Sequence, residues 1–206
     1  MSRKVKYKTS LIGTIRTHLS GLSGYDVLIL ELIQNADDGE AKKMVIDVRD
    51  SGLKIQNNAE FSYCGNIEEE NCSSEDTCDF HSILDVASGN KAHNSENIGR
   101  VGIGFISTYQ ITDRPKIISN GLSVVLTPET DNADFDEINT KETTFEMPWA
   151  RDPKSKLREA LVQEHINDKK IEQFFIDCES VLNQSLLFLK NLNKIELKRN
   201  GDSKLV

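Results

Sequence analysis

The sequence predicts an α+β fold, and two observations support this prediction. A largely apolar run, Tyr25–Gly39, repeats its apolar residues with the period of a buried helix. A strand at residues 43–49 follows it, with alternating apolar and polar side chains, and residues 53–57 return as its hairpin partner. A helix that leads into an antiparallel pair is typical of helices packed on a sheet.

Length and composition indicate one compact domain with an extension. The chain has 206 residues, 37% of them hydrophobic, which suffices for one core. We expect the domain at residues 1–150 and, at residues 151–206, a charged helical extension with the start of a following domain. The net charge of −8 argues against direct nucleic-acid binding. No membrane span or signal peptide is evident, so a soluble, cytoplasmic protein is expected.

The other elements are predicted from apolar periodicity and turn residues. Helices are expected at residues 9–21, 83–87, 104–112, 153–165 and 170–191. Strands are expected at residues 115–119, 122–127, 143–147 and 194–198. Loops are expected at residues 59–79, 91–97 and 131–140. The turn at Asn200-Gly201 leaves too few residues for a proper return strand.

Glu31, Asn35 and Asp38 form a polar stripe on the apolar helix. Their spacing places them within roughly 40° of one another around the helix axis. Leu30 and the other apolar residues are expected to bury the rest of the helix, and a buried carboxylate needs a partner. A metal ion with a nucleotide would provide one. The alternative is a structural acid, with Glu31 paired to Arg16 or Arg100.

A glycine-rich segment, Gly99–Phe105, enters the helix predicted to begin at Gly104. Free N–H groups and the positive end of the helix dipole make such an entry a phosphate site. The glycines have the reverse order of the dinucleotide fingerprint, and no Gly-Lys-Ser/Thr follows, so neither that fold nor a P-loop is predicted. A tight loop that needs positive φ is the alternative.

The cysteines do not predict a metal site from their spacing. Cys72, Cys78 and His81 lie close in sequence, but their separations fit no C-x2-C pair. The acidic run Glu68–Glu70 among them is typical of a solvated loop. Reduced thiols without a metal are therefore expected here, as for Cys64 and Cys178.

Five segments, in order, resemble the motifs of the GHKL ATPase superfamily, which includes gyrase B, Hsp90, histidine kinases and MutL. They are Glu31–Asp38, Asn57–Ala59, Ser88–Lys91, Ile98–Phe105 and Thr143–Phe145. Within the superfamily the chain is most similar to the sacsin-type, Hsp90-like module, through Glu31–Asp38, Ile111–Pro115 and Ser185–Leu192. The resemblance implies a two-layer Bergerat sandwich with a mixed, mostly antiparallel sheet covered by helices on one face.

The resemblance also implies binding of ATP or ADP with Mg²⁺, and slow hydrolysis. Glu31 resembles the general base that activates the attacking water, and Asn35 the magnesium ligand. Asp38 would support the pocket wall. Asn57 would accept a hydrogen bond from adenine, and Thr143 would complete the adenine pocket.

The phosphates would lie on the glycine segment under a lid at residues 88–97. Ser88 and Lys91 belong to this lid, and Lys91 would reach the γ-phosphate unless it is only a solvated lysine. The backbone groups that would hold the phosphates belong to Gly99, Val101, Gly102, Ile103, Gly104 and Phe105.

Two residues depart from the superfamily pattern. Asn57 stands where an aspartate usually accepts the adenine amino group, so that the charge assistance is lost. Glu142 stands where a glycine is usual, and we expect its side chain to point away from the pocket.

The implied function is a nucleotide-driven, chaperone-like switch that acts on protein clients, with a following domain and a nucleotide-dependent dimer as further partners. One alternative is an ATPase component of a nucleic-acid-processing or defence machine. Another is a module that binds nucleotide without hydrolysis, or a degenerate scaffold, as Asn57 and Glu142 would suggest. A histidine-kinase role is disfavoured because His18 is a lone histidine on a short helix.

Overall fold

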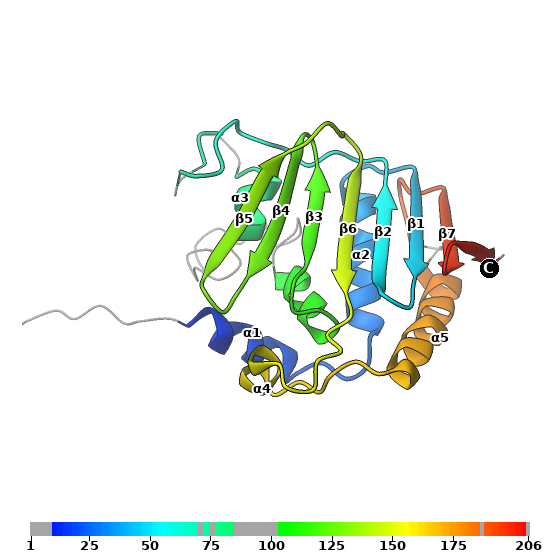
Figure 1. Cartoon of the computed structure of the whole chain (residues 1–206). Coiled ribbons are helices and arrows are strands. Elements are labelled where there is room, and N and C mark those ends of the chain that lie inside the picture. Colours follow the sequence, from blue (N-terminus) through cyan, green and yellow to red (C-terminus); the bar gives the residue numbers. More distant parts are fainter. Residues whose placement is uncertain (1–9, 70–71, 75–76, 85–102, 186–187, 205–206) are drawn as a thin grey trace, which may run out of the picture.

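The computed structural model describes residues 10–69, 72–74, 77–84, 103–185 and 188–204 (Figure 1). In this part of the chain eight strands form one sheet with the order β5-β4-β3-β6-β2-β1-β7-β8. The strands are β1 (Lys43–Val48), β2 (Gly52–Asn57), β3 (Lys116–Ser119), β4 (Leu122–Thr127), β5 (Asn132–Glu137), β6 (Thr143–Pro148), β7 (Lys194–Arg199) and β8 (Asp202–Lys204). β1 and β7 pair in parallel, and the other neighbours are antiparallel.

Helices cover one face of this sheet. The described helices are α1 (Leu11–Leu19), α2 (Asp26–Asp38), α3 (Asp79–Leu84), the 3-10 helix η3 (Ile103–Gln110), α4 (Lys156–Leu161) and α5 (Asp168–Ser185), of which α1 and α4 lie below the sheet in Figure 1. In Figure 1 the sheet is seen face-on, with α2 behind β6 and β2 and with α5 at the end that carries β7. The predicted α+β fold, a mixed sheet covered by helices, is confirmed.

The sheet is apolar toward the helices and polar on its other face. On the inner face Ile46 of β1, Ile55 of β2 and Phe145 of β6 lie side by side and are buried. On the outer face Lys54 lies 3.6 Å from Glu146, which also pairs with Lys116. This alternation is expected of an antiparallel sheet with one solvated face.

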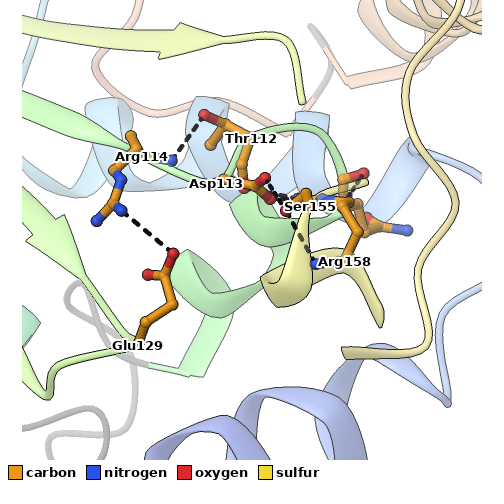
Figure 2. Close-up of polar contacts among 7 residues, drawn as sticks. Thr112, Asp113, Arg114, Glu129, Ser155 and Arg158 are labelled. Carbon is orange, nitrogen blue, oxygen red and sulfur yellow. Dashed lines mark hydrogen bonds and ion pairs between the residues drawn. The ribbon is translucent and has the colours of Figure 1, made fainter. Parts of the chain in front are cut away.

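A second, smaller core joins α1, η3 and α4 below the sheet in Figure 1. Its buried side chains are Ile15, Leu19, Ile106, Tyr109, Leu157 and Leu161. The buried Arg158 of α4 closes this region, because its guanidinium donates to Asp113 and to the carbonyls of Gln110 and Thr112 (Figure 2). Ser155 caps α4 and also donates to Asp113, at 2.8 Å. These hydrogen bonds hold the segment that follows η3 against α4.

Several elements differ from the sequence prediction. The polar segment predicted as a loop contains β5, which escaped prediction because this mostly exposed edge strand has no apolar alternation. The return strand thought to lack residues exists as the three-residue β8. The helix predicted at residues 104–112 is η3, a 3-10 helix in which Thr108 Oγ1 donates to the carbonyl of Phe105, three residues earlier.

The predicted burial of α2 is also wrong at one point. Leu30 is 36% exposed and Val27 is 38% exposed, whereas Leu28, Ile29 and Ile33 are buried. The helix therefore has one solvated edge beside its polar stripe. Among the described residues no helix combines the length and apolarity needed to cross a membrane.

Candidate nucleotide site

A cavity of about 220 Å³ lies where α2 meets the ends of β2 and β6. Three of the residues predicted to bind nucleotide line it, namely Asn35, Asp38 and Asn57. The other lining residues are Ala36, Gly39, Ala59, Glu60, Phe61, Ser62, Asp79, Asn120 and Phe145. The fold thus brings the polar stripe of α2 and the second sequence motif to one place.

Asn57 is the last residue of β2, and its side chain is held in the pocket wall. It is buried, and its Oδ1 accepts a hydrogen bond from the Ala59 N–H at 3.0 Å. A carbonyl oxygen has a second lone pair, so Oδ1 retains one acceptor site. The next residue, Asn58, has another task, since its Oδ1 accepts the backbone N–H groups of Lys42 and Lys43.

Thr143 lies opposite Asn57 in the register of β2 and β6. Its hydroxyl donates to the carbonyl oxygen of Ala59 at 2.8 Å and lies 2.7 Å from the Ser119 hydroxyl. Ser119 in turn accepts the Phe61 N–H. Thr143 is completely buried, so its main contribution is to fix the backbone of the pocket wall at Ala59 and Phe61.

Glu31 packs against the glycine segment. A Cβ atom placed on Gly104 would overlap the Glu31 carboxylate, so any larger residue there requires the Glu31 side chain to move. Burial raises the pKa of Glu31, the nearby His18 lowers it and the carboxylate of Asp38 raises it, with a net increase. Among the described residues, the basic side chain that lowers the pKa of Glu31 is His18 of α1; Arg16 is exposed, and Arg100 lies outside the described part of the chain.

Asp37, between these site residues, has a structural role that sequence analysis missed. Its carboxylate is buried and accepts the backbone N–H groups of Lys190, Asn191 and Leu192 at 3.0, 2.7 and 2.8 Å. Burial opposes ionisation, but these hydrogen bonds outweigh it and hold the pKa of Asp37 below its usual value. Two motifs used for the resemblance, around Asp37 and around Asn191, are thus in contact.

The structure covers the glycine segment only in part. Ser88, Lys91, Gly99, Val101 and Gly102 lie outside the described residues. Ile103 and Gly104 begin η3.

Phe105 belongs to the main core, where its ring lies 6.0 Å from that of Phe145. Phe145 also lines the cavity, so the contact between these two rings connects the glycine segment to the cavity wall. Glu142 is exposed, as expected.

This combination of an open sheet, helices on one face and a polar helix stripe at a cavity is consistent with the GHKL class of folds. The sacsin domain family matches residues 8–141, so the chain belongs to this family. It is 27% identical to human sacsin over an alignment of 232 positions that covers 87% of this chain and 5% of that protein. It is 33% identical to Protein NO VEIN of Arabidopsis thaliana over an alignment of 98 positions that covers 45% of this chain and 3% of that protein. The chain spans a small fraction of both relatives.

Proposed function

We propose that the cavity binds the base and ribose of Mg²⁺-ATP, and that the chain is the nucleotide-binding module of a conformational switch. The main support is that Asn35, Asp38 and Asn57 converge on one cavity, while Glu31 from the same helix stripe packs on Gly104. The cavity is smaller than the ~300–1,000 Å³ usual for ligand sites. The phosphates of the nucleotide would therefore extend from it toward the glycine segment.

The oxygen donors of α2 fit a hard cation such as Mg²⁺. The Asn35 amide and the Asp38 carboxylate line the same cavity, and Mg²⁺ prefers oxygen ligands, commonly one or two from protein with phosphates and water. Asn35 would hold the ion, which when bound would neutralise phosphate charge. Asp38 would support the wall beside it, and the Asn57 Oδ1 would accept a hydrogen bond from the adenine amino group.

Glu31 would orient the attacking water and take its proton. Its pKa is raised in the direction of neutral pH, which suits a general base. We expect slow hydrolysis, because phosphoryl transfer depends mainly on charge neutralisation, and a following domain would have to add further cationic contacts.

Calorimetry with this chain tests the proposal. ADP and a non-hydrolysable ATP analogue are titrated, with and without Mg²⁺, into the wild type, Asn35→Ala and Gln34→Ala. Gln34 is the exposed neighbour of Asn35 on α2 and is the matched control. Asn35→Ala should weaken Mg²⁺-dependent binding far more than metal-free binding, and Gln34→Ala should weaken neither. Equal losses with and without Mg²⁺ would refute the ligand role, and no binding to the wild type would refute the function.

We propose that this switch works in the cytoplasm in a chaperone-like way, on the basis of the motifs that resemble those of Hsp90. Such a module should protect an unfolding client protein from aggregation to different extents with ADP and with the ATP analogue. Light scattering of a heated client measures this. Salt-dependent retention on DNA, without any client effect, would instead favour a nucleic-acid machine.

A further inference from the structure

Three cysteines and a histidine that are spread along the loop after β2 meet at one point. They are Cys64, Cys72, Cys78 and His81, separated by seven, five and two residues. Their ligand atoms all lie within 4.8 Å of one another. The Nδ1 atom of His81 lies 3.1 Å from the sulfur of Cys78 and 3.5 Å from that of Cys64.

We propose that these four side chains form a structural zinc site. A tetrahedral Zn²⁺ with three thiolate ligands and one imidazole requires ligand atoms about 3.5–3.8 Å apart, from the usual Zn–S and Zn–N bond lengths. The observed separations bracket this value, so small side-chain rotations suffice. Three soft sulfurs with one nitrogen are a ligand set typical of structural zinc.

The surroundings orient the histidine for this role. Its Nε2 lies 3.0 Å from the backbone carbonyl oxygen of Glu69, which can only accept, so Nε2 carries the proton. Nδ1 is then left with its lone pair facing the sulfurs. A hydrogen bond from the distal nitrogen to a carbonyl is the usual support of a zinc-bound histidine.

The backbone supports one of the thiolates as well. The sulfur of Cys72 accepts the N–H of Cys78 at 3.3 Å, which favours the charged form. The sulfur of Cys64 instead lies 3.3 Å from the carbonyl oxygen of Asn66, a contact that requires the thiol proton. Zinc would displace this proton and turn Cys64 from Asn66 toward the other three ligands.

The site would brace one wall of the proposed nucleotide cavity, a consequence that rests on the proposed function. Asp79 follows Cys78 directly, and its carboxylate accepts the N–H and the hydroxyl of Ser62, both at 2.8 Å. Asp79 and Ser62 line the cavity with Asn35 and Asn57. The loop is irregular in its described part, so a metal would replace the packing that a regular element provides.

Metal analysis of the whole chain tests the site. The chain is produced with added zinc, passed through gel filtration and analysed by mass spectrometry of its metal content. We expect about one zinc per chain in the wild type. Cys72→Ala and His81→Ala should lose most of it. Cys178→Ala, a buried cysteine in α5 outside the cluster, should keep it. Equal zinc content in all the variants would overturn the proposal.

A second measurement avoids dependence on variant folding. Co²⁺ titrated into the reduced, metal-free wild type should produce the visible bands of tetrahedral cobalt and a thiolate charge-transfer band. Zn²⁺ should then displace both. The absence of these bands would overturn the site. A disulfide that persists under reducing conditions, detected as an intact mass lower by two hydrogens, would also overturn it.

ADP binding separates this inference from the proposed function. If the wild type holds zinc but does not bind Mg²⁺-ADP, the nucleotide proposal fails and the zinc site stands. If Mg²⁺-ADP binds equally well to the wild type and to zinc-free Cys72→Ala, the bracing of the cavity wall is overturned. We expect zinc loss to weaken ADP binding about tenfold, the effect of a moderately disturbed wall.

Discussion

Two carboxylates of α2 have pKa values shifted in opposite directions. Burial raises the pKa of Glu31, while at Asp37 the backbone hydrogen bonds outweigh burial and lower it. The sequence alone does not distinguish the roles of these two residues, because both are acidic residues of the same motif. The raised pKa of Glu31 fits a proton acceptor, and the lowered pKa of Asp37 fits a charged acceptor that holds backbone N–H groups in place.

Glu31→Gln should separate catalysis from stability. A raised pKa in the fold means that a stability contribution present at low pH is lost as pH rises through the folded value. Removing the charge should therefore leave the melting temperature at pH 8 equal or higher. If Glu31 is the general base, turnover should fall by roughly 10²–10⁴ with ATP affinity within a few-fold. A large melting loss with unchanged hydrolysis would end the catalytic role.

Asp37→Asn should destabilise the chain by roughly 1–3 kcal/mol at pH 7, because buried N–H groups lose a charged acceptor. A lowered folded pKa gives stability that is present above the unfolded value, about 3.9, and is lost as pH falls through the folded value. The variant and the wild type should therefore converge in acid. Urea unfolding at several pH values measures this, with Asp136→Asn, an exposed position of the edge strand β5, as the control. A constant difference across pH would contradict the assignment.

At the scale of elements, close contacts decide how the helices meet. α2 approaches η3 because Gly104 leaves room for Glu31, and α4 is held to the segment after η3 by the Arg158–Asp113 pair (Figure 2). Both contacts join segments that are distant in sequence, and both place the glycine segment relative to the polar stripe.

Gly104→Ala should destabilise the chain by roughly 0.5–1.5 kcal/mol, since the added methyl group forces the Glu31 side chain away from its preferred rotamer. In combination with Glu31→Ala the loss should be smaller than the sum of the two single losses, because the shortened side chain makes room. Chemical denaturation of all four proteins of this double-mutant cycle gives the coupling. Additive losses would mean that the contact is not the cause.

Arg158→Met should cost roughly 3–5 kcal/mol, because it removes the guanidinium donor from two carbonyls and from the Asp113 carboxylate, which keeps the Ser155 hydroxyl. The nearby pair Arg114–Glu129 is the control, since Arg114 has a 48% exposed side chain. Arg114→Ala should cost about 0–1 kcal/mol. Similar unfolding midpoints for the two variants would show that burial does not govern these pairs.

At the scale of the whole molecule, one sheet joins segments that are far apart in the sequence. β7 pairs in parallel with β1, and α5 adds Phe174, Phe175 and Cys178 to the main core. The parallel pair requires a long crossover, which here runs through almost the entire chain.

A chain ending at residue 150 should therefore fail to fold, because it exposes the core covered by α5 and leaves β1 without its parallel partner β7. A chain ending at residue 204, which keeps β8, should fold like the full sequence. Circular dichroism and thermal melting compare them. A cooperative melt of residues 1–150 would instead establish the domain boundary expected there.

The sequence determined the α+β class, the polar stripe of α2 and the order of the motifs. Helical period, strand alternation and glycine entries are local signals, because they arise from backbone geometry over a few residues. The edge strand β5 gave no such signal, since a solvated strand needs no apolar alternation.

Tertiary structure alone decided which distant groups meet. The anchor at Asp37, the fit of Glu31 against Gly104 and the cluster of Cys64, Cys72, Cys78 and His81 depend on contacts between segments. Their spacings carry no period, because an irregular loop can bring together residues at any separation. For that reason the cysteine spacing predicted no metal, whereas the folded loop places four ligand atoms within the reach of one ion.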